Sequence, residues 1–389
     1  MDTGMEKIRL GIVGFGSMGL NHAKAILSDV PEAELTAVST RSGTYVEPLR
    51  QMKKDVQVFR TAQELYAAGV CDAVLIATPH RQHVEQTMQA FDAGLHVLLE
   101  KPTGVCTAEV RRLNEVADRS GLVFGAMFNQ RTNPVCRKMR EIVASGEYGA
   151  IRRTNVIITD WLRAQSYYES SPWRATWKQD GGGVLLNQAP HNLDLWQWIC
   201  GMPARVHAFC GFGRWHDVEI EDDVTAYAEY ANGAAGTFIT CTGETPGTNR
   251  FEISMDGGQL VWEHNRLLLR VPQTTASQFI CEYSGGYGKP EVTVTDITPQ
   301  EDYPKHAGVT RAFARHLLYG EPMVADGREG LQSLMLANAM VLSAWTGRTI
   351  ELPMGDEDEA LYARMLEERA ALSRERQTAG IRIDPSASF

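Results

Sequence analysis

Residues 73–103 read AVLIATPHRQHVEQTMQAFDAGLHVLLEKPT, and this stretch decides the fold. Ala73 to Ala77 and His96 to Leu99 are short apolar runs, typical of strands that are covered on both faces. Between them, Gln82 to Ala93 has the apolar spacing of a helix. Such a unit places Lys101 at the carboxyl end of its second strand, which is where ligands bind in an open α/β sheet.

The composition limits the classes of protein to consider. The chain has 389 residues, which suggests two domains, with 43% apolar and 22% charged residues. A net charge of −10 without a basic tract argues against nucleic acid or an anionic membrane as partner. No apolar run approaches the ~20 residues that span a bilayer, and the N-terminus has no signal-peptide core, so we expect a cytoplasmic protein. The seven cysteines lack CxxC or CxxH spacing, so we expect reduced thiols in core positions and no metal site.

A glycine-rich turn follows the first predicted strand. Ile8 to Val13 is apolar and leads directly into GFGSMG, after which a helix is predicted to begin near Ser17. A strand, G-x-G-x-x-G and a helix in this order are typical of dinucleotide binding, because glycine lets the backbone approach a pyrophosphate at the helix N-terminus. A glycine-rich turn without a ligand is the alternative. The predicted cofactor residues here are Gly14, Phe15, Gly16, Ser17, Met18 and Gly19.

The end of the second predicted strand bears on the choice of cofactor. Glu34 to Ser39 is followed by Thr40 and Arg41, where NAD-binding chains usually carry an acidic residue for the ribose hydroxyls. Hydroxyl groups and a guanidinium suit a 2'-phosphate. We therefore expect Ser39, Thr40 and Arg41 to contact the cofactor and favour NADP(H), with NAD(H) still open.

The pattern of predicted secondary structure changes near Asn129. Before it, strands alternate with helices, which predicts a mostly parallel, doubly wound sheet. After it come a long strand at Arg152 to Asp160 and hairpin-like strands, which predict an open, mostly antiparallel sheet with a face free for a dimer contact. The predicted fold is α/β: a Rossmann dinucleotide-binding domain (1–129), a substrate-binding and oligomerisation domain (130–354), and a charged helix and tail (355–389).

A second group of candidate chemical residues lies in GGGVLLNQAPHNLD, residues 181–194. We expect one helical segment from Gly183 to Ile199, in which Asn187, His191 and Asp194 share a face. A histidine on a rigid helix is suited to taking a proton from an alcohol. The structural alternatives are a core histidine, an N-cap for Asn187 and backbone binding by Asp194. Lys101 has an alternative of its own, as an exposed lysine in a turn.

Four stretches together resemble one family. GIVGFGSMG, IATPHRQHVEQTMQAFDAGLHVLLEKP, GGGVLLNQAPHNLD and DGREGLQSLMLANAMVLSAWTGRTIELP look like the Gfo/Idh/MocA oxidoreductases, over roughly residues 7 to 353. The resemblance implies a Rossmann domain, an open sheet used for oligomerisation, and NAD(P)-dependent hydride exchange with a hydroxyl or ketone of a sugar or cyclitol. Lys101 matches the lysine of the family's EKP motif and His191 matches its active-site histidine. Thr78, Pro79, His83 and Glu100, with Lys101, are then expected on the cofactor side.

The sequence departs from the family pattern at one position. Many members have D-x-x-x-H, and this chain has Asn187 in place of the aspartate. A carboxylate stabilises an imidazolium, whereas an amide orients the ring without adding charge. Our hypothesis is that His191 and Lys101 share the proton transfer and that Asn187 positions them or binds substrate.

A polar and aromatic segment from Trp161 to Trp177 is predicted to shape a sugar pocket, because aromatic faces pack on pyranose rings. Three functions are open: a dehydrogenase or reductase of a sugar, glycoside or inositol; a glycoside 3-oxidoreductase that keeps and recycles its nicotinamide; and a sensor or scaffold that binds dinucleotide without turnover. We expect a homodimer or homotetramer. The candidate substrate residues are Lys101, Asn129, Arg131, Trp161, Arg163, Trp173, Arg174, Asn187 and His191.

Overall fold

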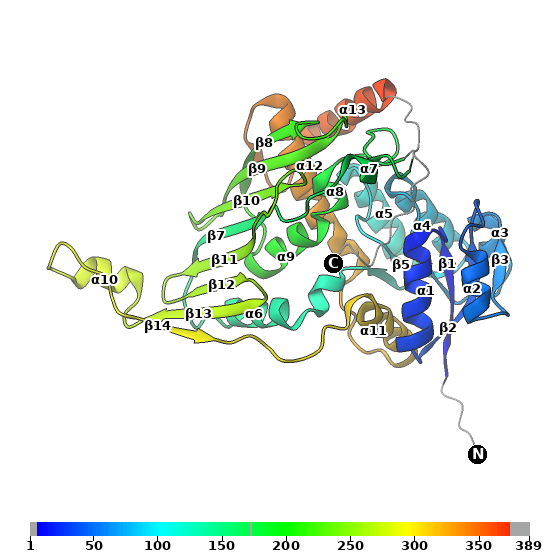
Figure 1. Ribbon diagram of the computed structural model, residues 1–389, viewed down its shortest axis with the longest axis horizontal. Coiled ribbons are helices and arrows are strands. Elements are labelled where there is room, and N and C mark those ends of the chain that lie inside the picture. Colours follow the sequence, from blue (N-terminus) through cyan, green and yellow to red (C-terminus); the bar gives the residue numbers. More distant parts are fainter. Residues whose placement is uncertain (1–5, 172, 374–389) are drawn as a thin grey trace, which may run out of the picture.

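The computed structural model describes residues 6–171 and 173–373, and these form two sheets with helices packed around and between them (Figure 1). The first sheet has six parallel strands in the order β3-β2-β1-β4-β5-β6. This order reverses between β1 and β4, so a crevice opens there at the carboxyl ends of the strands. The strands are β1 (Ile8–Val13), β2 (Ala33–Ser39), β3 (Gln57–Phe59), β4 (Ala73–Ile76), β5 (His96–Leu99) and β6 (Phe124–Ala126).

The strands of this sheet are continuous apolar runs because helices cover both of its faces. All four residues of β4 are buried, and they pair in parallel with β1 and with β5. Local caps set the helix ends, as where Thr61 accepts a hydrogen bond from the Glu64 backbone at 3.2 Å. The helices are α1 (Ser17–Asp29), α2 (Val46–Met52), α3 (Ala62–Ala67), η1 (His80–Gln82), α4 (His83–Asp92) and α5 (Thr107–Ser120).

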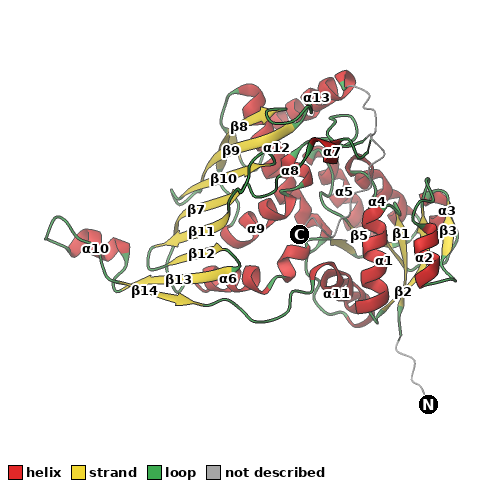
Figure 2. Ribbon diagram, viewed as in Figure 1, coloured by secondary structure: helices red, strands yellow, loops and turns green. Residues whose placement is uncertain are grey.

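The second sheet has nine strands in the order β14-β13-β12-β11-β7-β10-β9-β8-β15. Only β7 and β10 pair in parallel within it, so the expectation of a mostly antiparallel sheet is confirmed (Figure 2). The strands are β7 (Ile151–Ile158), β8 (Arg205–Phe212), β9 (Glu221–Glu229), β10 (Ala235–Cys241), β11 (Asn249–Met255), β12 (Gln259–Glu263), β13 (Arg266–Pro272), β14 (Val292–Asp296) and β15 (Ile350–Glu351).

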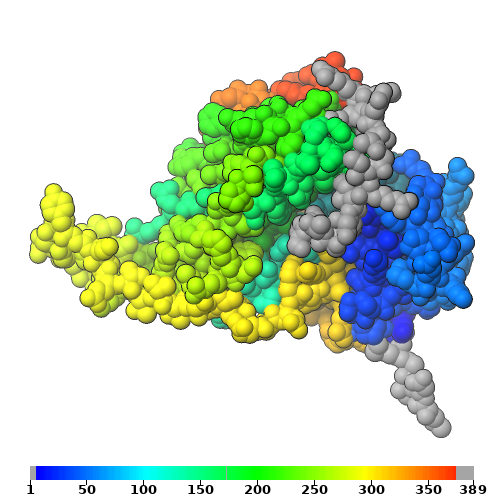
Figure 3. Space-filling view, in the orientation of Figure 1, coloured from blue at the N-terminus to red at the C-terminus, as the bar shows by residue number. Residues whose placement is uncertain are grey.

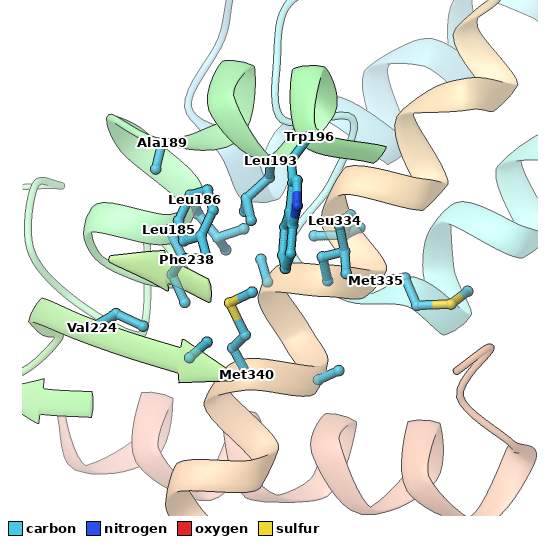
Figure 4. Packing of buried hydrophobic residues seen from close by; sticks show 14 of the residues in the cluster. Leu185, Leu186, Ala189, Leu193, Trp196, Val224, Phe238, Leu334, Met335 and Met340 are labelled. Atoms are coloured by element: carbon cyan, nitrogen blue, oxygen red, sulfur yellow. The ribbon is translucent and has the colours of Figure 1, made fainter. Parts of the chain in front are cut away.

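Helices cover one face of the second sheet. Trp196 stacks on Phe238 of β10 with ring centroids 5.6 Å apart, and Leu193 and Met340 lie in the same buried cluster (Figure 4). This packing fixes the segment that carries His191 against the sheet. The helices that follow β6 along the chain are η2 (Asn129–Thr132), α6 (Pro134–Ser145), α7 (Gln165–Tyr168), α8 (Val184–Asn187), α9 (Pro190–Cys200), α10 (Ala276–Glu282), α11 (Lys305–Tyr319), η3 (Gly327–Glu329), α12 (Gly330–Thr346) and α13 (Asp356–Leu372).

The other face of the second sheet is open. Along β9, Val224 and Ala226 are buried while Thr225 and Tyr227 are exposed, which is the alternation of a sheet covered on one side only. Phe209 of β8 is 71% exposed on the same face, opposite Thr225. The segment containing α10, between β13 and β14, projects from the body of the molecule (Figure 3).

The prediction of a single helix from Gly183 to Ile199 is wrong. The structure has two helices there: α8 ends at Asn187, and α9 begins at Pro190. The break falls at this point because proline has no N–H to continue the α8 ladder, while it is well suited to the first turn of a new helix. Asn187 and His191 therefore lie on different helices, and only His191 and Asp194 share one.

The chain returns to the first sheet late in its course. Val309 and Phe313 of α11 lie in one buried cluster with Ile8 and Leu10 of β1. The division at residues 129 and 354 stays a prediction, because residues far along the sequence complete the first core. Strands β8, β14 and β15 and helix α10 were not expected, and residues 374–389 of the predicted tail lie outside the described range.

The cysteines occupy varied environments. All seven are free thiols; four are buried and two are half-buried, but Cys281 of α10 is exposed, so the expectation of core positions is wrong there. None of the helices within the described ranges is long and apolar enough to cross a membrane. Among the same residues, no cluster of histidine, cysteine or carboxylate side chains could hold a metal ion.

Candidate active site

A cleft of about 960 Å³ opens at the carboxyl ends of β1, β2, β4 and β5. Its opposite wall comes from the loop and helices between Trp161 and Gln188. The cleft therefore lies where the strand order of the first sheet reverses. Thirteen predicted cofactor residues line it: Gly14, Phe15, Gly16, Ser17, Met18, Ser39, Thr40, Arg41, Thr78, Pro79, His83, Glu100 and Lys101.

The glycine-rich turn has two packing glycines and one open glycine. Gly14 has φ +86°, and a Cβ there would lie 2.8 Å from the Ala77 carbonyl carbon. Gly19 does not line the cleft, and its Cβ would lie 3.1 Å from Gly14 O. A Cβ on Gly16 would meet no atom within 4 Å. Gly14 and Gly19 thus hold the turn, while Gly16 leaves room for a pyrophosphate at the N-terminus of α1.

The end of the cleft near β2 carries arginine and hydroxyl groups. Ser39 ends β2, and the next residue, Thr40, donates its backbone N–H to Phe59 O at 3.0 Å. This bond places the turn after β3 beside the turn after β2, so that Arg60 lines the cleft together with Arg41. Two guanidinium groups at the ribose end suit a 2'-phosphate.

A buried pair holds the strand end that carries Lys101. His22 Nε2 of α1 lies 2.7 Å from Glu100 Oε1, and Glu100 Oε2 accepts the Lys101 backbone N–H at 3.0 Å. Burial alone would raise the pKa of Glu100, but the hydrogen bond and charge of His22 hold it well below its usual range. His306 of α11 meets His22 edge-on and lines the cleft. Burial and His22 lower the pKa of His306 to about 4.

His83 connects the turns that follow β4 and β5. Its Nδ1 lies 2.6 Å from Pro102 O, and its Nε2 lies 2.8 Å from Thr78 O. The ring is 1% exposed, so it orders the backbone of the cleft wall. Both ring nitrogens are therefore engaged by the backbone carbonyls of Thr78 and Pro102, and neither is free to contact a ligand.

Lys101 reaches across the cleft to the second domain. Its Nζ donates to Asn187 O at 2.8 Å. Burial lowers the pKa of Lys101, while the charges of Glu100 and Asp180 oppose that shift and Arg174 adds to it. The alternative of an exposed surface lysine does not hold. The lowered pKa makes the neutral amine, which can accept a proton, more accessible than in an ordinary lysine.

Asn187 is the centre of a polar network. Its Oδ1 accepts from the Tyr167 hydroxyl at 3.1 Å, and its Nδ2 lies 3.3 Å from Asp180 Oδ2. The Tyr167 hydroxyl in turn accepts from Arg174 at 2.7 Å. The guanidinium of Arg174 lies 4.5 Å from the ring centroids of both Tyr167 and Trp173. The predicted substrate residues that line the cleft are Lys101, Trp161, Arg163, Trp173, Arg174 and Asn187.

His191 lies behind the cleft wall that carries Asn187. It is 2% exposed, packs edge-on against Phe128 with ring centroids 6.5 Å apart, and is not among the lining residues. Burial, and then the charge of Lys101, lower the pKa of His191 well below its usual value. The ring is therefore neutral near pH 7, and its proton affinity depends on the charge state of Lys101.

Two other predicted substrate residues are bound to protein groups away from the cleft. Arg131 Nε and Nη2 donate to the two Asp194 oxygens at 2.8 and 2.6 Å, and its Nη1 donates to Glu329 at 2.6 Å. Arg131 and Asp194 side chains are each 1% exposed. Asn129 donates to the Tyr303 hydroxyl at 3.2 Å. Neither Arg131 nor Asn129 lines the cleft.

Sequence reasoning assigned no role to several residues of the site. His80 and Asp180 form a pair across the two domains, with His80 Nδ1 3.0 Å from Asp180 Oδ1. Their only sequence signals were the position of His80 after Thr78-Pro79 and of Asp180 before the triple glycine. For Arg60 and His306 no motif gave a signal, because neighbouring strands and helix α11 bring them to the cleft.

Comparison with known proteins agrees with this architecture. Residues 8–128 match the family model described as an oxidoreductase family with an NAD-binding Rossmann fold, and residues 136–261 match the GFO/IDH/MocA C-terminal domain.

Relatives of known name extend the match. D-glucoside 3-dehydrogenase of Escherichia coli is 24% identical over 89% of this chain and 97% of its own length. The mouse (Mus musculus) trans-1,2-dihydrobenzene-1,2-diol dehydrogenase is 30% identical over 60% of this chain and 68% of its own. The solved WlbA dehydrogenase of Bordetella pertussis, in complex with NADH and UDP-GlcNAcA, is 25% identical with a TM-score of 0.73 and covers 90% of this chain and 100% of that one. The chain thus belongs to the Gfo/Idh/MocA oxidoreductase family, with its NAD-binding Rossmann fold in the N-terminal part.

Proposed function

We propose that this protein is an NAD(P)-dependent oxidoreductase that moves a hydride between nicotinamide and a secondary hydroxyl or keto carbon of a sugar, glycoside or inositol. The observation that carries the proposal is the position of Lys101. Its amine lies in the cleft that continues from the Gly14 turn, and it is held 2.8 Å from Asn187 O of the second domain. A proton-exchanging group therefore stands between a dinucleotide site and a polar pocket.

The proposed division of roles follows from these positions. The nicotinamide, when bound, accepts or supplies the hydride. Lys101, with its lowered pKa, takes the hydroxyl proton and returns it in the reverse direction. In this proposal His191, whose pKa is lowered by burial and by the charge of Lys101, shares the transfer from behind the wall. Asn187 positions Lys101 through its carbonyl and holds Tyr167 through its amide.

The walls of the pocket support a carbohydrate substrate. Trp161, Trp173 and Tyr167 line the pocket, and aromatic side chains are suited to pack on the apolar side of a sugar ring. Arg163 and Arg174 add donors for hydroxyl or acidic oxygens. The names of the relatives also support a hydroxylated ring as substrate, since they include a glucoside dehydrogenase, a dihydrodiol dehydrogenase and a myo-inositol dehydrogenase.

Two finer features belong to the same proposal. Arg41 and Arg60 at the end of the cleft favour NADP(H) over NAD(H), and the ratio of kcat/KM for the two cofactors tests this. The open face around Phe209 and Tyr227 is the proposed contact of a homodimer or homotetramer, because exposed aromatic side chains on a sheet face suit an interface.

Single-turnover hydride transfer tests the assignment. A panel of sugars, glycosides and inositols is first screened with the wild-type protein for a change at the reduced-nicotinamide band. On the active substrate, Lys101→Ala and His191→Ala should each lower the rate by about 10²–10⁴-fold. Lys289→Ala, at an exposed position, is the matched control and should keep the wild-type rate.

The outcomes separate the candidate functions. Wild-type rates in both variants would refute the roles of Lys101 and His191. Nucleotide binding without hydride transfer to any compound would refute the enzymatic function and leave a sensor or scaffold. Nucleotide that stays bound through purification, seen by native mass spectrometry, would place the protein among oxidoreductases that recycle their cofactor.

A further inference from the structure

We propose that His80, held by Asp180, is an additional acid–base residue of the cleft. This rests on the proposed function and adds to Lys101 a second proton-exchanging group that faces the substrate. The observation is a histidine that lines the cleft and whose inner ring nitrogen is bound to a buried carboxylate from the other domain.

The geometry orients the His80 ring. Its Nδ1 lies 3.0 Å from Asp180 Oδ1 and 3.2 Å from Asp180 O, so both acceptors surround the same nitrogen. Trp173 and His83 meet the ring edge-on, with centroids 6.0 and 5.8 Å away. In the neutral ring the proton therefore sits on Nδ1, and Nε2 is the acceptor. Across residues 6–171 and 173–373, no hydrogen-bond partner contacts His80 Nε2.

The carboxylate of Asp180 is well fixed. Its side chain is 2% exposed, Oδ2 accepts the Ala175 backbone N–H at 3.0 Å, and Asn187 Nδ2 lies 3.3 Å from the same oxygen. A buried carboxylate needs positive charge and hydrogen bonds to offset the cost of its desolvation. The His80 Nδ1–H supplies one of these hydrogen bonds, so the pair fixes which ring nitrogen carries the proton.

The surrounding charges limit where the proton goes. The titratable and charged groups next to the pair are His83 on α4, Lys101 after β5, Arg174 in the loop and Glu221 on β9. Glu221 does not line the cleft. His83 is bound to two backbone carbonyls, and Arg174 keeps its charge at all relevant pH values. Lys101 is therefore the other group in this set that can exchange a proton with substrate.

The proposed step conserves atoms and charge. With nicotinamide bound to take the hydride from the carbinol carbon, the hydroxyl proton would pass through the Lys101 amine to His80 Nε2, and the C–O bond would become a carbonyl. The ring is then an imidazolium whose Nδ1–H stays on Asp180, and it loses the Nε2 proton to water from the open cleft. In the reverse direction the imidazolium returns the proton to the carbonyl oxygen as hydride arrives.

Three variants test this role. His80→Asn keeps an amide donor for Asp180 but cannot titrate, and His80→Gln is a second variant if the first folds poorly. Asp180→Asn keeps the shape and removes the charge. His264→Asn, in an exposed turn between β12 and β13, is the matched control. Each variant is first checked for nucleotide affinity and thermal unfolding, and single-turnover oxidation is then measured from acid to alkaline pH.

The expected result is a loss of rate with a changed pH profile. His80→Asn should lower the rate by about 10²-fold or more and leave only the part of the fall at acid pH that comes from Lys101, because no ring remains to be protonated. Asp180→Asn should lower the rate as well, because the ring loses the carboxylate that holds its Nδ1 proton. A change in KM alone with the wild-type pH profile would overturn the proposal and make His80 a substrate ligand only.

A separate measurement distinguishes failure of this proposal from failure of the proposed function. In ¹⁵N-histidine spectra of the full chain, the ring signal that disappears in His80→Asn is followed with pH. Its chemical shift, which reports which ring nitrogen carries the proton, should change in Asp180→Asn whether or not a substrate is known. An unchanged ring chemical shift would overturn the pairing, whereas absence of hydride transfer in the wild-type protein would overturn only the function on which the proton step depends.

Discussion

Two buried aspartates of this protein, Asp180 and Asp194, hold basic partners in similar ways but face different surroundings. Asp180 binds His80, a lining residue of the cleft. Asp194 binds Arg131 through two bonds of 2.6 and 2.8 Å, and both side chains are 1% exposed, away from the cleft. The chemistry of the pairs is alike. The difference is access to the cleft. His80 lines the cleft and is the group proposed to exchange protons, whereas Arg131 is buried and holds two helical segments together.

The largest effect expected from this comparison is on stability. Arg131→Met leaves Asp194 charged and buried without its partner, so we expect the free energy of unfolding to fall by about 3–5 kcal/mol. Urea unfolding measures this. Arg137→Met is the control, because Arg137 and Glu301 are both exposed and such pairs contribute about 0–1 kcal/mol. If Arg131→Met instead kept its stability and raised KM, Arg131 would contact substrate, as the sequence had suggested.

A third buried carboxylate should make stability depend on pH. Glu221 is fully buried and accepts the Gly183 and Leu185 backbone N–H groups at 2.8 and 3.2 Å. Burial raises its pKa to about 7, so the folded protein keeps a proton that the unfolded chain releases near its ordinary pKa. The stabilisation is fully present below about pH 4.3 and is lost as pH rises through about 7, by roughly 3 kcal/mol.

The control for this prediction is Glu221→Gln, which keeps one acceptor oxygen and cannot ionise. Its free energy of unfolding should lose this pH-dependent component between about pH 4 and pH 7. Equal slopes for wild type and variant over that interval would show that Glu221 does not titrate there.

The smallest of these effects distinguishes two glycines of one turn. Gly14→Ala puts a Cβ 2.8 Å from the Ala77 carbonyl carbon at φ +86°, so it should destabilise the fold by about 1–3 kcal/mol. Gly16→Ala adds its Cβ in open space and should change stability by less than about 0.5 kcal/mol while raising the Kd for the dinucleotide. Thermal unfolding and nucleotide titration measure both. Equal losses of stability would mean that Gly16 also has a packing role.

The parts of the fold that were predictable from sequence are those set by local patterns. Apolar runs such as Ala73 to Ile76 form buried strands wherever helices cover both faces. GFGSMG after a strand is compatible with few backbone conformations other than the dinucleotide-binding turn. The Gly183 to Ile199 segment misled us, because apolar spacing runs through it while Pro190 starts a new helix. The short edge strand β15 pairs only through Ile350 and Glu351, too few residues for a pattern to show.

The candidate site was less predictable, because the type of a charged residue does not indicate which residue it pairs with in the fold. Asn187 and Lys101 were found by motif, and the structure joins them across 86 residues of sequence. Arg131 was expected among the substrate residues, but its guanidinium donates to Asp194 and Glu329 instead. The sequence did not point to His80 as a site residue, since a histidine beside Thr78-Pro79 gives no indication that Asp180 lies next to it.

By itself the sequence determined the Rossmann sheet, the glycine turn and the placement of Lys101 at a strand end, because these depend on hydrophobic periodicity and backbone freedom over a few neighbouring residues. Only the tertiary structure decided which polar side chains face the cleft. His22 with Glu100, and His80 with Asp180, are 78 and 100 residues apart. Their pairing follows from strand order and from the docking of the second domain, which no local pattern encodes.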